Sequence, residues 1–480
     1  MHVATSPEFK RNATRAMADV SLQKALANSR PQFTARRGRA VAALPEFEAL
    51  RDTARDIKNH TLANLDFYLE AWESRLLAAG GKVHWCATAE DARNAVLAIC
   101  QAAGARTVTK GKSMIGEEIA INDHLERAGI TPVETDLGEY IIQLRHELPS
   151  HIIAPAFHLN REDWEAQFRK SHTDLPPDRV FHERRDILTE ARTKLRERFL
   201  AADVGITGAN FLIAETGSSV IVTNEGNGDL TQTLPRVHIV LASIEKVVPT
   251  LEDCCSLLRV LARSATGQEF SVYTTFSTGA RRPNDLDGPE EYHVVLLDNG
   301  RSAMLGGEFQ DMLRCIRCAA CMNHCPVYGA VGGHAYGWVY PGPMGSVLTP
   351  ALIGVDQAGQ LPNASTFCGK CESVCPVKIP LPKLMRHWRE REFERHLTPA
   401  TVRQGLAFWA FFARRPALYR LATRVGAATL GWLGRKRGRF SSFPLAGGWT
   451  GGRDLPAPEG DTFFARYAKA QRQTDRQGRP

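Results

Sequence analysis

The sequence predicts an α/β domain with a parallel sheet, flanked by helical segments and joined to a small cysteine-rich domain. Short β-rich runs alternate with helical runs from KVHWC at 82–86 to TPVETDLGEYIIQL at 131–144, the order that builds parallel βαβ units. The later runs HIVLAS and HVVLL are apolar throughout, which is typical of strands covered on both faces. Seven of the eleven cysteines fall between Cys315 and Cys375. These three observations define the fold class.

The chain of 480 residues is long enough for several domains. The parts that we predict are a helical N-terminal region at 1–79, the α/β domain at 80–305, the cysteine-rich domain at 306–385 and a basic helical extension at 386–480. Inside the α/β domain we expect a helical insertion at about 160–202, two strands around a Thr-Gly turn at 205–223, a strand entering a helix at 236–248 and a buried strand from Glu291.

Composition and charge limit the function classes. The first residues lack the apolar core of a secretory signal, and no stretch is apolar enough to span a bilayer, so we expect a cytoplasmic protein without a transmembrane segment. From Pro376 onward, 21 Lys and Arg face 7 Asp and Glu. Since no nucleic-acid-binding motif accompanies this basic tail, we expect an acidic protein partner there, with peripheral contact to an anionic membrane as the alternative.

Polar side chains gather where the predicted strands of the α/β domain end, which is where such folds bind ligands. The run TKGKS follows a strand, but Arg106 stands where a phosphate loop needs its first glycine, and no GxGxxG fingerprint occurs. A helix N-terminus after a strand remains an anion site in principle, while turns and helix caps explain the same residues equally well. The residues of this candidate anion pocket are Lys110, Ser113, Glu134, Asp136, Glu215, Thr216 and Asn224.

The run CIRCAACMNHCP carries the most specific signal. Cys315, Cys318, Cys321 and Cys325, followed by Pro326, have the spacing of bacterial ferredoxins that hold two iron-sulfur clusters. Structural zinc sites pair their cysteines across a longer loop, so zinc does not fit this spacing. The sequence therefore predicts iron-sulfur ligation.

A second run, FCGKCESVCP, repeats the motif without its first cysteine. Aligned from Cys375, it places Cys371 and Cys368 correctly and puts Ser365 where the missing thiol would stand. In such motifs the last cysteine of each run serves the other cluster. The first cysteine set, for one 4Fe-4S cluster, is then Cys315, Cys318, Cys321 and Cys375, and the second cysteine set is Cys325, Cys368 and Cys371.

The second cysteine set lacks one protein thiolate. Its fourth iron is then absent, bound by a non-cysteine ligand such as Ser365, or open to a partner's ligand; serine ionises least readily and is the weakest option. We expect a 3Fe-4S or readily interconverting 4Fe-4S cluster there. The remaining cysteines, Cys86, Cys100, Cys254 and Cys255, stand among apolar neighbours, and we expect all four to be buried and unreactive.

The segments GKSMIGEEIAIN, VETDLGEYIIQL, SHIIAPAFH and GITGANFLIAETGSSVIVTNEGN, together with the split cysteine motif, closely resemble the lactate utilization protein B family over nearly the whole chain. The resemblance implies a LUD domain similar to the NagB/RpiA/CoA-transferase folds. It also implies that all seven cysteines of the two sets bind clusters. The partners that it implies are a cysteine-rich, heterodisulfide-reductase-like subunit and a second LUD protein.

The sequence is compatible with three functions from different classes. The first is an electron-transfer subunit, non-catalytic or co-catalytic, of a complex that oxidises L-lactate to pyruvate. The second is that the LUD domain binds the hydroxy acid, or a CoA-like anion, and is itself the catalytic subunit. The third is an assembly scaffold whose clusters are structural. Redox titration separates the third from the others, because structural clusters need not change oxidation state.

Overall fold

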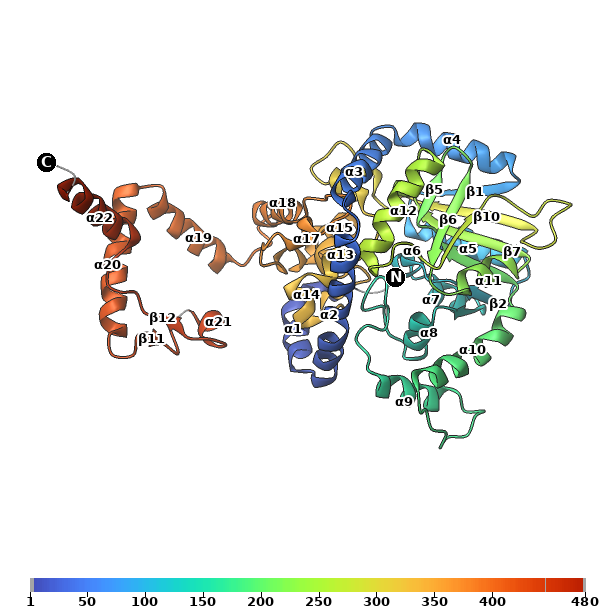
Figure 1. Ribbon diagram of the computed structural model, residues 1–480, viewed down its shortest axis with the longest axis horizontal. Helices are drawn as coiled ribbons and strands as arrows, with labels where there is room; N and C mark the ends of the chain where they lie inside the picture. The colour runs from blue at the N-terminus through green and yellow to red at the C-terminus, as the bar shows by residue number, and fades with distance from the viewer. Residues whose placement is uncertain (1–3, 445, 478–480) are drawn as a thin grey trace. The chain divides into compact units, whose positions relative to one another are not determined.

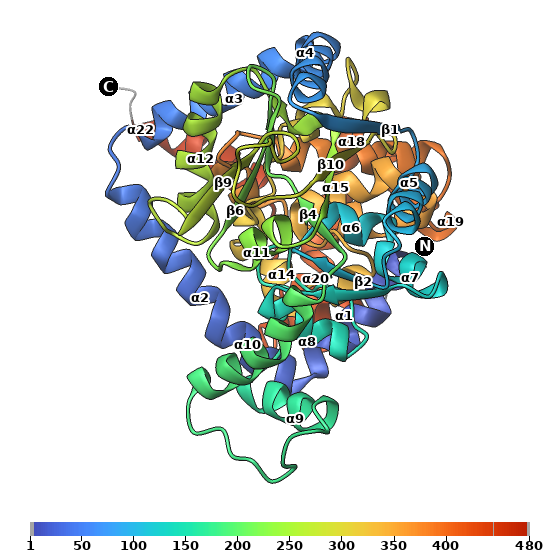
Figure 2. The ribbon, with the colours of Figure 1, turned by 90° about the vertical axis from the view of Figure 1, so that its right-hand side faces the viewer.

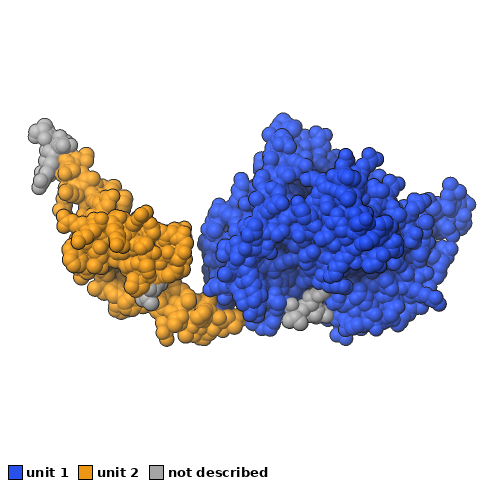
Figure 3. Space-filling view, turned by 90° about the horizontal axis from the view of Figure 1, so that it is seen from below, with its two compact units in different colours: residues 1–392 blue, residues 393–480 orange. Residues whose placement is uncertain are grey.

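The computed structural model describes residues 4–444 and 446–477. It divides into two compact units, residues 1–392 and residues 393–480 (Figure 3). We call them unit 1 and unit 2 and describe each by itself.

A six-stranded parallel sheet forms the centre of unit 1, in the order β1-β10-β7-β4-β2-β3 (Figure 1). Every neighbouring pair in it is parallel, which confirms the predicted sheet. The strands span Gly81–Cys86 (β1), Glu291–Leu297 (β10), Val237–Ser243 (β7), Val204–Gly208 (β4), Thr107–Lys110 (β2) and Thr131–Glu134 (β3).

Both faces of this sheet are covered, as its apolar strands require. Along β7, Ile239 and Leu241 pack with α5 (Ala89–Ala102) on one face, while Val240 and Ala242 pack with α4 (Leu65–Ala78) on the other. Figure 2 shows the helices on either side of the strands. The remaining helices of the α/β domain are α6 (Met114–Ile119), α7 (Ile121–Arg127), α8 (Leu137–Leu144), α9 (Arg161–Ser171), α10 (Arg184–Leu200), α11 (Asn227–Thr233) and α12 (Leu251–Ala265).

A second, four-stranded sheet lies beside the first, in the order β8-β5-β6-β9. Its strands are Val247–Val248 (β8), Phe211–Ile213 (β5), Ser218–Thr223 (β6) and Tyr273–Ser277 (β9). The predicted turn is present, and Gly217 has a φ of +74° there; a Cβ at this position would lie 2.5 Å from the backbone nitrogen of Leu76. The strand predicted to enter a helix at 236–248 instead ends in a single 3-10 turn, Ile244–Lys246, that leads into β8.

The N-terminal helices pack against the cysteine-rich segment as well as the sheet. They are α1 (Phe9–Ala18), α2 (Val20–Ala42), α3 (Phe47–Ala63) and α4. Arg30 of α2 donates to the carbonyl oxygen of Asn323 at 2.9 Å, and the rings of Phe9 and Tyr336 lie 5.3 Å apart. Figure 1 shows α1 and α2 beside α13 and α14. These helices therefore pack against a segment that lies some 300 residues later in the sequence.

The cysteine-rich segment is a series of short helices. Their bounds are Ala320–Asn323 (α13), Pro326–Val331 (α14), Gly342–Ile353 (α15), Val355–Ala358 (α16), Lys370–Ser373 (α17) and Leu381–Glu394 (α18). Its apolar side chains join one core with α1, α2, α3 and α12. On α12, Cys254 is buried, whereas the adjacent Cys255 is exposed. The expectation that Cys255 is buried was wrong, because neighbouring helical residues point to different faces.

Unit 2 consists of α19 (Ala400–Ala413), α20 (Pro416–Gly434), α21 (Gly447–Thr450), α22 (Phe463–Gln477) and two two-residue strands, Arg439–Phe440 (β11) and Leu455–Pro456 (β12). Among its residues whose burial is described, only Gly434 is buried. Across the described part of the chain, no helix combines the length and apolar character needed to cross a membrane.

Candidate metal centre

The first cysteine set lines one enclosed cavity, together with apolar side chains that include Ile152. Cys315 is half-buried and the other three cysteines of the set are buried. Between the first cysteines of the motif, Arg317 and Ala319 adopt positive φ angles of 58° and 60°. Non-glycine residues rarely take this conformation, so the backbone accepts a cost to curl this segment around the cavity.

The thiols of the first set act on one another. Burial raises the pKa of Cys321 well above its ordinary value, and the neighbouring thiols, first among them Cys318, act in the same direction. Burial also raises the pKa of Cys375 to about 11. Against this, the N–H of Ile379 lies 3.4 Å from the Cys375 Sγ and favours the thiolate. Converging buried thiols with N–H donors suit a metal centre, which binds them as thiolates.

The second cysteine set reaches the surface. Cys325 caps the N-terminus of α14, where its Sγ accepts from the N–H of Tyr328 at 3.5 Å. Cys371 is buried, which raises its pKa to about 12. Cys368 is exposed, and the N–H of Lys370 is the largest of the causes that lower its pKa.

Ser365 occupies the position of the absent eighth cysteine. Its Oγ accepts a hydrogen bond from the N–H of Phe367 at 3.1 Å, within its own loop. Its carbonyl oxygen accepts from Nη2 of Arg389 at 3.4 Å. The side chain thus has a structural use of its own, which favours a second site with three ligands from this chain.

The two cysteine sets adjoin one another. After burial and the thiols of its own set, the Cys371 thiol also raises the pKa of Cys321. Burial raises the pKa of Tyr336 well above its usual range, and the thiols of Cys325 and Cys321 add to this effect. Tyr336 therefore lies within electrostatic reach of both sets.

Buried cations surround the first set. Arg51 of α3 donates from Nε and Nη2 to the carbonyl oxygen of Cys375 at 3.0 and 2.7 Å, and Arg37 of α2 donates to that of Val374 at 3.0 Å. These contacts explain why the N-terminal helices cover this part of the chain. They also place two guanidinium groups beside the cavity.

A buried ionic network adds further positive charge beside Cys315. Its members are Lys58, Lys246, Arg301 and Arg317, with Glu118 and Glu245 as the carboxylates. Arg301 pairs with Glu118 at 2.7 Å and with Glu245 at 3.1 Å. Four cations thus face two carboxylates. Because an iron-sulfur cluster with its thiolates carries net negative charge, this excess fits a cluster in the cavity of the first set.

The structure separates the residues of the candidate anion pocket. Ser113, Asp136 and Asn224 line one cleft of the α/β domain. Glu215 and Thr216 instead lie at the β5–β6 turn, where Glu215 accepts from the N–H of Leu251 at 2.9 Å. Lys110 and Glu134 are buried elsewhere and do not line that cleft.

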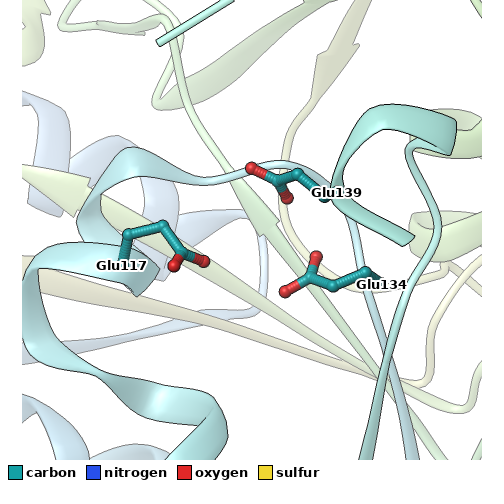
Figure 4. A group of neighbouring side chains, drawn as sticks. All are labelled: Glu117, Glu134 and Glu139. Carbon is teal, nitrogen blue, oxygen red and sulfur yellow. The ribbon is translucent and has the colours of Figure 1, made fainter. Parts of the chain in front are cut away.

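Lys110 belongs to a buried cluster with Glu117, Glu134 and Glu139, whose carboxylates point toward one another (Figure 4). The ammonium of Lys110 lies 2.7 Å from Glu134 and 3.0 Å from Glu117. Burial, and then the charge of Glu134, raises the pKa of Glu139 well above its ordinary value. With Glu139 neutral, one lysine faces two carboxylates, so the net charge of the cluster falls from −2 to −1.

Sequence reasoning missed several polar groups at the cleft. Lys246 and Arg317 line it, as does Asn210. Arg317 lies inside the cysteine motif itself, and that position was the available signal. Lys246 follows a strand that was expected to enter a helix, so the sequence pattern did not predict that its side chain lines the cleft.

The fold and the cysteine sets define a class of protein in which an α/β domain is joined to an iron-sulfur domain with two cluster sites. Two family models agree: the LUD domain matches residues 69–297 and the 4Fe-4S dicluster domain matches residues 311–379. The chain belongs to the lactate utilization protein B family. This confirms the resemblance seen in the sequence.

Individual relatives extend over almost the whole chain. Lactate utilization protein B of Macrococcus caseolyticus is 42% identical over 95% of both chains, and that of Bacillus subtilis is 41% identical over 96% of both. An uncharacterized electron transport protein, YkgF of Escherichia coli, is 40% identical over 100% of both chains.

Proposed function

We propose that this chain is the iron-sulfur electron-transfer subunit of a multi-protein system that oxidises L-lactate to pyruvate. The observation that carries the proposal is that a four-cysteine set with three buried members adjoins a three-cysteine set in which Cys368 is exposed. The choice of lactate as the substrate rests on the relatives, which are named lactate utilization protein B. When bound, the clusters provide one-electron transfer, which the side chains of this protein cannot provide.

In this proposal the first set holds a 4Fe-4S cluster, and the second holds a 3Fe-4S or 4Fe-4S cluster with three cysteine ligands. Ile152 and the other apolar walls exclude water from the first cavity. Arg51 and the ionic network offset negative charge in the interior, which makes the cluster easier to reduce. The finer fold of the LUD domain is proposed to be that of the NagB/RpiA/CoA-transferase group.

The exposed Cys368 marks the surface where a partner's redox centre can approach. The partners in this proposal are a cysteine-rich, heterodisulfide-reductase-like subunit and a second LUD protein. Oxidation of L-lactate releases two electrons and two protons, and the chain offers no flavin or nicotinamide fingerprint that could accept a hydride. The chemical step is therefore assigned to the assembled system.

Unit 2 is proposed as the docking segment for a protein partner. Its helices α19 and α20 expose large apolar side chains, among them Phe408 at 69% and Trp432 at 72%, next to several arginines. Surfaces of this kind bind acidic partners or anionic membranes. Deleting residues 401–480 should abolish a salt-sensitive complex with the partner proteins in size-exclusion chromatography. Unchanged assembly, or binding to anionic vesicles alone, would count against a protein partner.

The central experiment uses the full chain reconstituted anaerobically with iron and sulfide. We expect two clusters per chain, reversible reduction in a redox titration, and no oxidation of L-lactate with an artificial acceptor until the partner proteins are added. Robust lactate turnover by the single chain would instead favour a catalytic LUD domain. Clusters that cannot be reduced or oxidised would favour the structural scaffold.

A further inference from the structure

The cleft lined by Lys112, Ser113, Asn210 and Asn224 lies at the carboxyl ends of β2 and β4. This is the edge of a parallel sheet at which α/β folds bind ligands. Strand β6 and helix α12 supply its other walls. The cleft thus has the position of a ligand site, and nothing in the cluster ligation uses its polar groups.

Lys246 is the group in this cleft that most requires a ligand. Its side chain is buried, with the residue only 6% exposed, and it lines the cleft. Within residues 4–444 and 446–477, its ammonium has no hydrogen-bond acceptor. A largely buried lysine side chain whose ammonium has no acceptor is unfavourable, so an anion bound in the cleft would stabilise it. The other two cations of the cleft already have acceptors: Lys112 donates to the carbonyl oxygen of Ile153, and Arg317 pairs with Glu245.

The remaining lining limits the size and charge of that anion. Asn210 Oδ1 accepts from the N–H of Val222 at 2.9 Å, which leaves the amide NH2 group of Asn210 without an acceptor in the described part of the chain. That group can donate to a hydroxyl or keto oxygen. Asp136 and Glu225 also line the cleft and would repel a polyanion such as a nucleotide. A small carboxylate with one further oxygen therefore fits best.

The cleft adjoins the first cysteine set. Ile152 lines both the cleft and the cysteine cavity, so a single side chain contributes to the walls of both. Arg317 lies between Cys315 and Cys318 in the motif and also lines the cleft. Lys246 interacts electrostatically with Cys315 as well. The same cations thus face a ligand on one side and the cluster ligands on the other.

We infer that the cleft binds a small α-hydroxy or α-keto carboxylate against Lys246 and Asn210, and that its occupancy is linked to the charge on the first cluster. The choice of acid rests on the proposed function. Reducing the cluster adds negative charge beside Lys246 and Arg317, which weakens carboxylate binding. By reciprocity, the bound carboxylate lowers the reduction potential by the equivalent amount.

The test uses the reconstituted full chain with L-lactate and pyruvate as probes in anaerobic equilibrium dialysis. We expect saturable binding to the oxidised protein and weaker binding after reduction with dithionite. Lys246→Met should weaken binding about tenfold or more, because it removes a charge-assisted hydrogen bond. Asn210→Asp retains the acceptor for Val222 but adds a negative charge to the cleft, and it should weaken binding as well. This second variant preserves the test if Lys246→Met does not fold.

The matched control is Lys58→Met. Lys58 also lies near Cys315 but does not line the cleft. This variant should lower the cluster potential while it retains saturable binding and the potential shift on adding pyruvate. Clusters that titrate normally in a wild-type chain without detectable carboxylate binding would overturn the inference and leave the proposed function intact. Affinities unchanged in both cleft variants would overturn it too. Saturable binding to a chain whose clusters do not change oxidation state would overturn the linkage and the proposed function together.

Discussion

The two cysteine sets arise from nearly the same motif but occupy different environments. The first has four cysteines around an enclosed apolar cavity, with arginines from α2 and α3 at its border. The second has three cysteines and exposes Cys368. The motif therefore determines which thiols converge, whereas distant segments determine how well they are covered. The first set is suited to retaining its cluster, and the second is suited to contact with a partner at the surface.

The largest effect is expected when one ligand of the first set is removed. Cys318→Ala leaves three thiols in a cavity lined by apolar side chains, so we expect loss of a whole cluster, about four iron atoms per chain, with the second cluster retained. Iron and sulfide analysis with EPR measures this. Cys100→Ala is the control, since Cys100 is buried in α5 away from both sets. Equal iron loss in both variants would contradict the assignment.

The next test changes the second set by one ligand. Wild-type protein should show an EPR signal of an oxidised 3Fe-4S cluster that disappears when iron is added. Ser365→Ala should leave this behaviour unchanged, because the Ser365 hydroxyl serves its own turn. Ser365→Cys should hold a complete cubane and lower its potential through the added thiolate charge. If Ser365→Ala destroyed a stable second cubane, serine would be a ligand.

A smaller effect should follow from Arg51, whose charge affects the first set. Arg51→Met removes both hydrogen bonds to the carbonyl oxygen of Cys375 and a buried positive charge. We expect a lower potential of the first cluster, by an amount on the order of tens of millivolts, in a mediated redox titration. Arg55→Met, one turn later and more exposed, should change little. Equal shifts in both clusters would contradict a local effect.

The smallest expected effect is a loss of folding stability at acid pH. Burial lowers the pKa of His151 to about 4, from an ordinary value of 6.5. Its Nδ1 accepts from the N–H groups of Ile153 and Ala154, and its Nε2 lies 3.0 Å from Asn323 Oδ1. In the sequence, Asn323 stands between a cysteine of the first set and a cysteine of the second. This neutral ring contributes its full stability above pH 6.5 and loses it as the pH falls toward 4.

Between pH 7 and pH 5 the loss from His151 should be about 2 kcal/mol. Urea unfolding at both pH values measures it. His151→Gln can keep both kinds of hydrogen bond but does not titrate, so it should show a smaller pH dependence. An identical dependence in the two proteins would show that His151 does not contribute.

The sequence predicted the parallel sheet because strands such as β7 are apolar on both faces, and it predicted the cysteine sets because their spacing is local. It missed β8, whose two residues carry no periodic signal, and the buried pairing of Lys110, which depends on contacts between separate segments. It predicted a helical N-terminal region at 1–79 but not what these helices contact. Their contacts with the cysteine segment are hydrogen bonds to backbone carbonyls, which no side-chain pattern reveals.

Those contacts have a consequence for biosynthesis. Helices α1 to α3 emerge from the ribosome first, yet the carbonyl groups that Arg37 and Arg51 hold belong to Val374 and Cys375. The parts of these helices that contact the cysteine-rich segment therefore stay uncovered until more than three hundred further residues have been translated. The first cluster faces the same delay, since three of its cysteines precede Cys375 by more than fifty residues. The first cluster site is thus complete only after Cys375, near the end of unit 1, has been translated.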